Sequence, residues 1–228
     1  NTFTGNLTLT SGALELGVTT AGGALTATAS GAVTDTGALT ITGVTTIDAG
    51  NNNVTLNGTG SDNDFKAAVR VIGADVTLVD AGAIDLGETT TTGNYVVTAT
   101  AGGDITDSGT LTIGTALSTK TATFTAAENR NIYLDNKDSS NVTSFGLHNF
   151  SGAVSFAASS NYLANVTVRD NSAFDFGAAL RLASGGNLIV TAAGNVTQTG
   201  GALTVPGTTT VDAASNTVTL SNSSNNFG

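Results

Sequence analysis

Thr34–Phe65 reads TDTGALTITGVTTIDAGNNNVTLNGTGSDNDF, and Thr197–Gly228 reads TQTGGALTVPGTTTVDAASNTVTLSNSSNNFG. A longer copy, Thr106–Phe145, reads TDSGTLTIGTALSTKTATFTAAENRNIYLDNKDSSNVTSF. The chain therefore repeats one pattern three times. A unit that cannot bury its own apolar face buries it against the next unit, so the repetition predicts one continuous solenoid over residues 1–228.

The segment ahead of each copy recurs as well, as N-L-T-L…A-L-E-L-G, D-V-T-L…A-I-D-L-G and N-V-T-V…A-F-D-F-G. We place three degenerate super-repeats at roughly 1–65, 66–145 and 146–228. An acid recurs at one position of this segment, and the recurrence predicts an exposed strand position (Glu15, Asp85, Asp175). A phenylalanine closes each unit or lies at its seam, which predicts an interior aromatic seam between coils (Phe3, Phe65, Phe145, Phe227).

Short runs of the form apolar–Thr–apolar alternate with turns rich in Gly, Asn, Ser and Asp. Alternation with period two is the mark of a β-strand, and Thr and Val favour strands, so helix content should be close to nil. Equivalent strands recur every 18–25 residues with three strands to each recurrence. That spacing predicts an all-β parallel β-helix of about eleven coils. The alternative, a row of immunoglobulin-like sandwiches, fits less well because the chain has no Trp and only three Tyr.

The charge argues against several partners. The formal net charge is −10, and the seven Lys and Arg residues are scattered. Binding to nucleic acid needs clustered cations that release counterions, so no nucleic acid is expected. No apolar run approaches the ~20 residues that a membrane-spanning helix needs, so no membrane insertion is expected. Cysteine is absent, which excludes disulfides and zinc–thiolate sites.

The residues point away from catalysis. Polysaccharide-acting β-helix enzymes need clustered carboxylates beside Arg or Lys, and the sequence shows no such cluster. His148 is the only histidine and is expected in a loop. Asp62–Asp64 is a weak calcium candidate, because Ca²⁺ takes six to eight oxygen ligands. We therefore expect no catalytic, cofactor-binding or metal-binding residues and no cofactor.

The repeated pattern N/D-V-T-L…A-x-D/E-L-G, T-x-S/T-G-x-L-T-I/V and N-x-V-T-L…N-x-F resembles the β-strand repeats of filamentous-haemagglutinin-like bacterial exoproteins of two-partner secretion systems. The resemblance covers essentially the whole chain and is specific for this class rather than for one protein. It implies a right-handed parallel β-helix on the surface of, or outside, a Gram-negative-type bacterium.

The expected function is mechanical: a structural shaft segment of a giant adhesin or surface filament. The ends look like ordinary internal coils, so the expected partners are neighbouring repeats or copies stacked end to end. An alternative is an adhesive module that contacts a host or cell-surface glycan or protein through loops 118–141 and 146–161. A polysaccharide-acting enzyme and an ice-binding solenoid with Thr-x-Thr rows are weaker alternatives. Asn57 and Asn222 lie in Asn-x-Ser/Thr triplets at turns and are candidate glycosylation sites.

Overall fold

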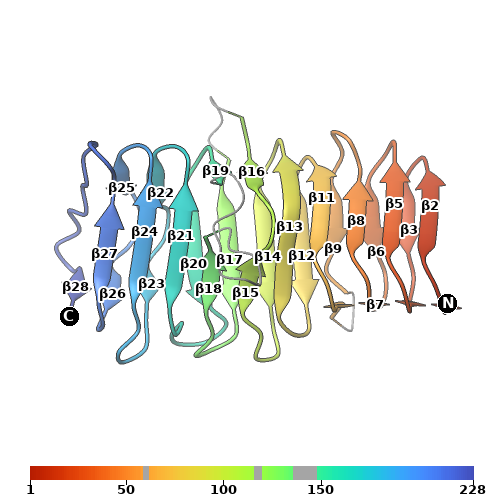
Figure 1. The fold of residues 1–228 in the computed structure, drawn as a ribbon, viewed down its shortest axis with the longest axis horizontal. Coiled ribbons are helices and arrows are strands. Elements are labelled where there is room, and N and C mark those ends of the chain that lie inside the picture. The colour runs from red at the N-terminus through yellow and green to blue at the C-terminus, as the bar shows by residue number, and fades with distance from the viewer. Residues whose placement is uncertain (59–61, 116–119, 136–147) are drawn as a thin grey trace.

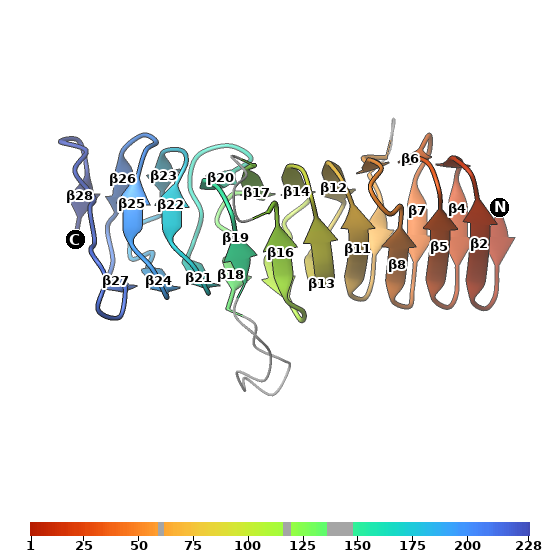
Figure 2. The same cartoon turned by 90° about the horizontal axis from the view of Figure 1, so that it is seen from above.

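The computed structural model describes residues 1–58, 62–115, 120–135 and 148–228. Throughout this part of the chain the fold is all-β, and no helix occurs in it. The strands wind into a parallel β-solenoid of about nine turns. The N- and C-termini lie at opposite ends of the rod (Figures 1 and 2). The predicted fold class is therefore confirmed.

In the described part of the chain four sheets form the walls of the rod, and their strands pair in parallel. The largest has twelve strands: β2 (Leu7–Ser11), β5 (Leu25–Ala29), β8 (Thr45–Asp48), β11 (Val69–Gly73), β13 (Ile84–Thr91), β15 (Ile105–Asp107), β16 (Leu111–Ile113), β18 (Ile132–Leu134), β19 (Asn149–Phe150), β21 (Val166–Asp170), β24 (Leu188–Ala192) and β27 (Thr209–Asp212).

The second sheet has nine strands: β3 (Leu14–Leu16), β6 (Val33–Asp35), β9 (Val54–Leu56), β12 (Val76–Asp80), β14 (Tyr95–Ala99), β17 (Ala122–Ala126), β20 (Val154–Ala158), β22 (Phe174–Phe176) and β25 (Val196–Gln198). A four-stranded sheet completes the first turns with β1 (Thr2–Phe3), β4 (Thr19–Ala21), β7 (Leu39–Ile41) and β10 (Asp64–Phe65). A three-stranded sheet completes the last turns with β23 (Leu180–Arg181), β26 (Leu203–Val205) and β28 (Asn226–Phe227).

The expected eleven coils were too many, because the turns lengthen toward the middle of the rod. Leu7 pairs with Leu25, which is 18 residues later, whereas Ile132 pairs with Val166, which is 34 residues later. The larger number of residues per turn in the middle of the rod accounts for the smaller number of turns. The early turns do contain three strands each, as the sequence pattern predicted.

The alternating pattern places every second side chain in the core. In β5 the residues at positions 25, 27 and 29 are buried while Thr26 and Thr28 are exposed. Corresponding residues of successive turns then stack; Val54, Val76 and Tyr95 lie in register on β9, β12 and β14. The rule that Thr faces outward has exceptions, since Thr45 and Thr89 are buried. One apolar column therefore runs through the rod.

Glycine is required where corners of successive turns meet. A Cβ atom on Gly103 would lie 1.9 Å from the carbonyl oxygen of Gly82 in the turn below. The preceding residue, Gly102, has a φ of +80°, which L-residues rarely adopt. The glycine pair thus lets two corners approach at the distance that the parallel strands require.

The strand pattern shifts where one repeat meets the next. Asn63 pairs with Asp80, and Val69 pairs with Leu86. In both pairs the residue of the next turn comes 17 positions later in the sequence. The first half of β13 therefore lies over the corner that leads into β11, and not over β10. At the second junction His148 faces Asp170 and Val154 faces Phe176, an offset of 22 in both pairs, so β22 lies over the corner that leads into β20.

This shift places equivalent sequences in different sheets. The strands that begin the three recurring segments are β2, β12 and β21. β2 and β21 belong to the twelve-stranded sheet, whereas β12 belongs to the nine-stranded one (Figure 1). A side chain that occurs once in each repeat is therefore presented on more than one side of the rod.

The predicted interior aromatic seam is not continuous among the described residues. Phe65 is buried, as predicted, but Phe3 and Phe227 are 38% and 40% exposed. Phe145 lies outside the described residues, and Phe150 of His148-Asn149-Phe150 takes the place of Phe65. The aromatic rings that do contact one another form a separate cluster in the middle of the rod: Tyr95, Phe124, Phe150, Phe156, Phe174 and Phe176.

We expect the core column to carry the stability of the rod. Leu56 is fully buried in β9, so Leu56→Ala should cost about 2–5 kcal/mol of unfolding free energy through lost burial and a cavity. Thr55→Ala, on the outward side of the same strand, is the matched control and should change stability far less. Urea unfolding followed by circular dichroism measures both. Equal losses in the two variants would contradict the assigned orientation of β9.

Candidate functional site

A polar bridge recurs once in each repeat, at the corner where the T-x-S/T-G turn meets the N-x-F strand, and it is buried in the first two repeats. In the first repeat, the Asn63 side-chain amide donates to Asp35 Oδ2 at 2.7 Å and its oxygen accepts the Leu39 N–H at 2.8 Å. Asn63 is completely buried and Asp35 almost so. The bridge joins two successive turns and satisfies a backbone donor that would otherwise be buried without a partner.

The third repeat builds the same bridge from amides. The Asn225 oxygen accepts the Leu203 N–H at 2.8 Å, and the Asn225 amide donates to Gln198 Oε1 at 2.8 Å. Gln198 occupies the place of Asp35 in the repeated sequence. An amide pair thus replaces an amide–carboxylate pair without loss of the backbone contact.

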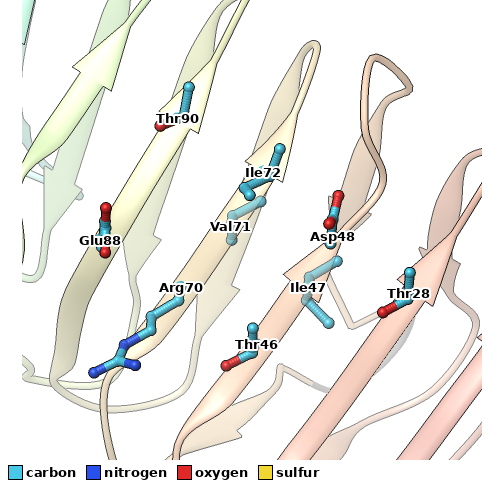
Figure 3. Close-up of a pocket in the computed structure, with 9 residues that line it drawn as sticks. All are labelled: Thr28, Thr46, Ile47, Asp48, Arg70, Val71, Ile72, Glu88 and Thr90. Atoms are coloured by element: carbon cyan, nitrogen blue, oxygen red, sulfur yellow. The ribbon is translucent and has the colours of Figure 1, made fainter.

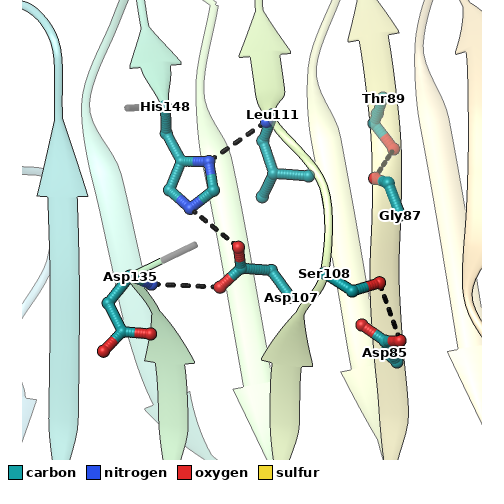
Figure 4. A network of polar contacts seen from close by, with 8 residues as sticks. All are labelled: Asp85, Gly87, Thr89, Asp107, Ser108, Leu111, Asp135 and His148. Carbon is teal, nitrogen blue, oxygen red and sulfur yellow. Dashed lines mark hydrogen bonds and ion pairs between the residues drawn. The ribbon is translucent and has the colours of Figure 1, made fainter. Parts of the chain in front are cut away.

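The second repeat places His148 in this position (Figure 4). Nδ1 of His148 accepts the Leu111 N–H at 3.1 Å, and Nε2 lies 3.4 Å from Asp107 Oδ2. Because Nδ1 is an acceptor, Nε2 carries the proton and faces the carboxylate. His148 is completely buried, so the expectation of a loop histidine was wrong. The sequence signal for this role is the alignment of His148-Asn149-Phe150 with Asn63-Asp64-Phe65, which the sequence analysis did not use.

A buried aspartate that accepts backbone hydrogen bonds lies at each junction between repeats. Asp80 is completely buried; its Oδ2 accepts the Phe65 N–H at 2.7 Å and its Oδ1 accepts the Gly82 N–H at 2.6 Å. Asp170 occupies the equivalent position, where the Phe150 N–H lies against its carboxylate and Oδ1 accepts from Ser172. Burial raises the pKa of both carboxyl groups to about 6. The first strand of a repeat thereby caps the last N-x-F strand of the preceding one.

The recurring acids of the second strand segment link turns to each other. Ser108 donates to Asp85 Oδ2 at 2.8 Å, and Thr197 donates to Asp175 Oδ1 at 2.9 Å. Asp85 and Asp175 are half-buried and only Glu15 is exposed, so the prediction of an exposed position holds for one of the three. Burial raises the pKa of Asp85, and the bond from Ser108 opposes that rise.

Turn asparagines form ladders along the rod instead of standing alone. The Asn165 amide donates to Asn131 Oδ1 at 2.9 Å, and Asn165 Oδ1 accepts the Asn187 N–H at 2.9 Å. Asn187 Oδ1 in turn accepts the Thr208 N–H at 2.8 Å. A second ladder runs through Asn53, Asp75, Asn94 and Thr121. Each corner is thus tied to the corners above and below it.

The loops proposed as an adhesive surface are largely part of the coil. Residues 118, 119 and 136–141 of the first loop, and residues 146 and 147 of the second, lie outside the described residues. The remainder of loop 118–141 contains β17 and β18, and loop 146–161 contains β19 and β20. Their A-T-F-T-A and V-S-F patterns place Phe124 and Phe156 in the core. The loop assignment was therefore wrong for the described parts.

An open hollow of about 380 Å³ lies on the twelve-stranded sheet at the first junction (Figure 3). Arg70 and Ile72 of β11 occupy its middle, flanked by Asp48 on β8 and Glu88 on β13. The remaining lining residues are Thr28, Thr46, Ile47, Val71 and Thr90. Asp48 and Glu88 lie on opposite sides of β11 and at different levels along it, since Asp48 faces Ile72 whereas Glu88 lies between the partners of Val69 and Val71. The hollow therefore offers separate polar contacts around Arg70 and Ile72.

The remaining candidate residues are separate from one another. Asn57 is exposed, whereas Asn222 is half-buried and its Oδ1 accepts the Ser224 N–H at 2.9 Å. In the Asp62–Asp64 segment, the Thr100 hydroxyl donates to Asp62, and Lys66 pairs with Asp64 at 2.7 Å. Across the described ranges no group of three His, Cys, Asp or Glu side chains is arranged to hold a metal ion. The same residues include no helix long and apolar enough to cross a membrane.

The three matched segments of one family model cover residues 4–72, 73–157 and 163–228. The chain belongs to this family, which is described as repeats of unknown function (DUF5649). The first two segments of the family end at residues 72 and 157, whereas the predicted limits are 65 and 145. No curated protein and no solved structure matches the chain significantly.

We expect the rod to become more stable as the pH falls below 7. Asp80 and Asp170 have pKa values of about 6 in the fold against ~3.9 in the unfolded chain, so the folded state takes up protons first. The gain begins near pH 6 and is complete below about pH 4, with up to about 3 kcal/mol for each group. Thermal melting between pH 4 and pH 8 measures it.

The control for this prediction comes from the chain itself, because Ser11 occupies the position of Asp80 in the first repeat. The double variant Asp80→Ser, Asp170→Ser should flatten the dependence of melting temperature on pH. A slope unchanged from that of the natural chain would assign the effect to other carboxylates.

His148 should be replaceable by the residue that the first repeat uses. His148→Asn should retain most of the stability, because Asn63 accepts the corresponding backbone N–H in the same geometry. His148→Ala should lose at least about 1–3 kcal/mol, since the Leu111 N–H is left buried without its acceptor. Equal unfolding free energies for the two variants would show that the bridge contributes nothing.

Proposed function

We propose that this chain is a shaft segment of an extracellular fibre on a Gram-negative-type bacterium. The observation that carries the proposal is the unbroken stacking of turns: parallel pairing continues through the twelve-stranded sheet from β2 to β27. Side-chain ladders and buried bridges link successive corners as well. Extension along the axis would have to break these contacts turn by turn, which suits a stiff spacer.

The surface location rests on the resemblance of the repeats to those of filamentous-haemagglutinin-like exoproteins. The handedness implied by that resemblance, right-handed, agrees with the general preference of parallel crossovers. The partners proposed for the shaft are neighbouring repeats or further copies, arranged end to end. Catalysis is not part of the proposal.

The proposal predicts a rigid rod in solution. Nine turns at a strand spacing of ~4.8 Å give a body roughly 43 Å long from its first strand to its last. Small-angle X-ray scattering should give the cross-section and length of a single straight rod. Stretching the chain between two marker domains by atomic force microscopy should show high resistance followed by stepwise loss of turns. A chain that extends smoothly at low force would rule out a shaft.

A binding role is a second candidate, and the hollow around Arg70 favours it. Arg70 offers five donors, while Asp48, Glu88 and the threonine hydroxyls offer acceptors around the exposed Ile72. Such a set suits the hydroxyl groups of a neutral glycan, since the charge of −10 repels polyanions. Titration with neutral oligosaccharides should give binding that Arg70→Ala removes and Thr106→Ala, on β15, leaves intact. Identical binding by both variants would eliminate the hollow as the site.

A further inference from the structure

Asn57 is the only asparagine of the sequence that is followed by a glycine, and the pair comes directly after β9. The Asn57 side chain is exposed, whereas Gly58 is buried and has a φ of +55°. In an Asn-Gly pair the backbone nitrogen of the glycine can attack the side-chain amide of the asparagine, because no Cβ atom on the glycine hinders the approach. The pair is therefore a candidate site of chemical modification.

The reaction is a deamidation, and water is its only co-reactant. The Gly58 nitrogen forms a bond to Cγ of Asn57 while the bond from Cγ to Nδ2 breaks. Nδ2 leaves as ammonia and carries the proton that the Gly58 nitrogen has lost. Water then opens the resulting cyclic imide. Cleavage of the new bond gives aspartate, and cleavage at the backbone carbonyl gives isoaspartate, whose backbone is longer by one CH₂ group.

In the folded chain a buried carboxylate holds the attacking nitrogen. The Gly58 N–H donates to Asp35, with its nitrogen 3.0 Å from Oδ2 and 3.2 Å from Oδ1. The Asn57 N–H donates to Oδ1 of the same carboxylate at 2.9 Å, and the Asn63 amide donates to Oδ2 at 2.7 Å. Asp35 ends β6 in the preceding turn and is only 4% exposed. Three neighbouring donors thus converge on one carboxylate.

This contact opposes both requirements of ring closure. The Gly58 nitrogen must lose its proton before it attacks, and the negative charge of Asp35, 3.0 Å away, disfavours a second negative charge there. The peptide between Asn57 and Gly58 must also turn toward Cγ, which breaks the hydrogen bonds to Asp35. The loss of a hydrogen bond to a charged acceptor is enough to slow a reaction about tenfold or more.

We infer that Asn57–Gly58 is a site of spontaneous deamidation, and that the Asp35 carboxylate slows the reaction in the folded chain. The reaction proceeds when this corner opens and the Gly58 nitrogen leaves the carboxylate. Deamidated chains are therefore those in which the corner of the first repeat has opened. The inference concerns the chemistry of this corner and does not depend on the proposed shaft function.

The second repeat indicates that the aspartate product fits the fold. Asp135 occupies the position of Asn57, and its N–H donates to Asp107 Oδ1 at 3.0 Å, as that of Asn57 does to Asp35. Asn57→Asp should therefore melt close to the natural chain. Isoaspartate lengthens the backbone between the two N–H groups that share Asp35, so chains that carry it should melt at a lower temperature.

The rate of deamidation at residue 57 tests the inference. The natural chain and Asp35→Asn are kept in mildly alkaline buffer, and peptide mass spectrometry follows the loss of the side-chain amide. Asp35→Asn removes the charge but keeps an oxygen acceptor, as Gln198 does at this position in the third repeat. It should deamidate at residue 57 about tenfold faster or more. Asp35→Gln, which installs the residue of the third repeat, is the second variant and should behave in the same way.

The natural chain supplies its own reference when it is unfolded in urea. Deamidation at Asn57 should be slower in the folded chain than in the unfolded chain by about tenfold or more. Equal rates in the two states would overturn the inference without the need of any variant. Folded Asp35→Asn with the rate of the natural chain would also overturn it.

Two further variants separate the carboxylate from a general loosening of the structure. Asn63→Ala removes a donor from the same corner but leaves the Asp35 carboxylate beside Gly58. Asp107→Asn changes the equivalent acid of the second repeat. Both should deamidate at residue 57 at close to the natural rate, after circular dichroism has shown that they are folded. An increase in Asn63→Ala as large as that in Asp35→Asn would assign the protection to packing of the corner and reject the role of Asp35.

Discussion

Hydrogen bonding between one turn and the next is the constraint on which the whole structure depends. In a parallel solenoid each strand bonds to the strand one turn below and to the strand one turn above. At the corners this ladder is incomplete, although some backbone bonds between turns continue there, as from the Gly43 N–H to the Gly23 carbonyl. Other corner donors are satisfied by side chains of neighbouring turns, as Asn63 does for Leu39 and Asn187 for Thr208.

This constraint explains why polar residues recur in a repeat whose core is apolar. The corner bridges vary in chemistry, with Asn and Asp in the first repeat, His and Asp in the second, and Asn and Gln in the third. What stays the same is the acceptor offered to the backbone N–H of a buried leucine. Stacking thus accounts for the recurring acids and asparagines.

The junction carboxylates show how the repeats are joined. Asp80 and Asp170 are buried at a cost that appears as raised pKa values, and each supplies the acceptor that a phenylalanine N–H needs where the strand pattern shifts. At this shift β13 runs without a break over the corner that leads into β11. The hollow that contains Arg70 lies at the same junction. The same local mismatch between repeats thus lies at both the Asp80–Phe65 contact and the hollow on the twelve-stranded sheet.

The sequence by itself determined the fold class, the three-strand turn and the inward positions such as Leu56, because alternation with period two and a repeat of coil length are local properties of the chain. It also indicated the repeat as the unit of the fold, in agreement with the three segments of the family. The number of turns and the placement of equivalent strands were decided by the tertiary structure, because they depend on how many residues separate the paired strands of successive turns. The burial of His148 and the pairing of Asp80 with Phe65 were decided there too, since each joins residues that are distant in sequence and meet only when the turns stack.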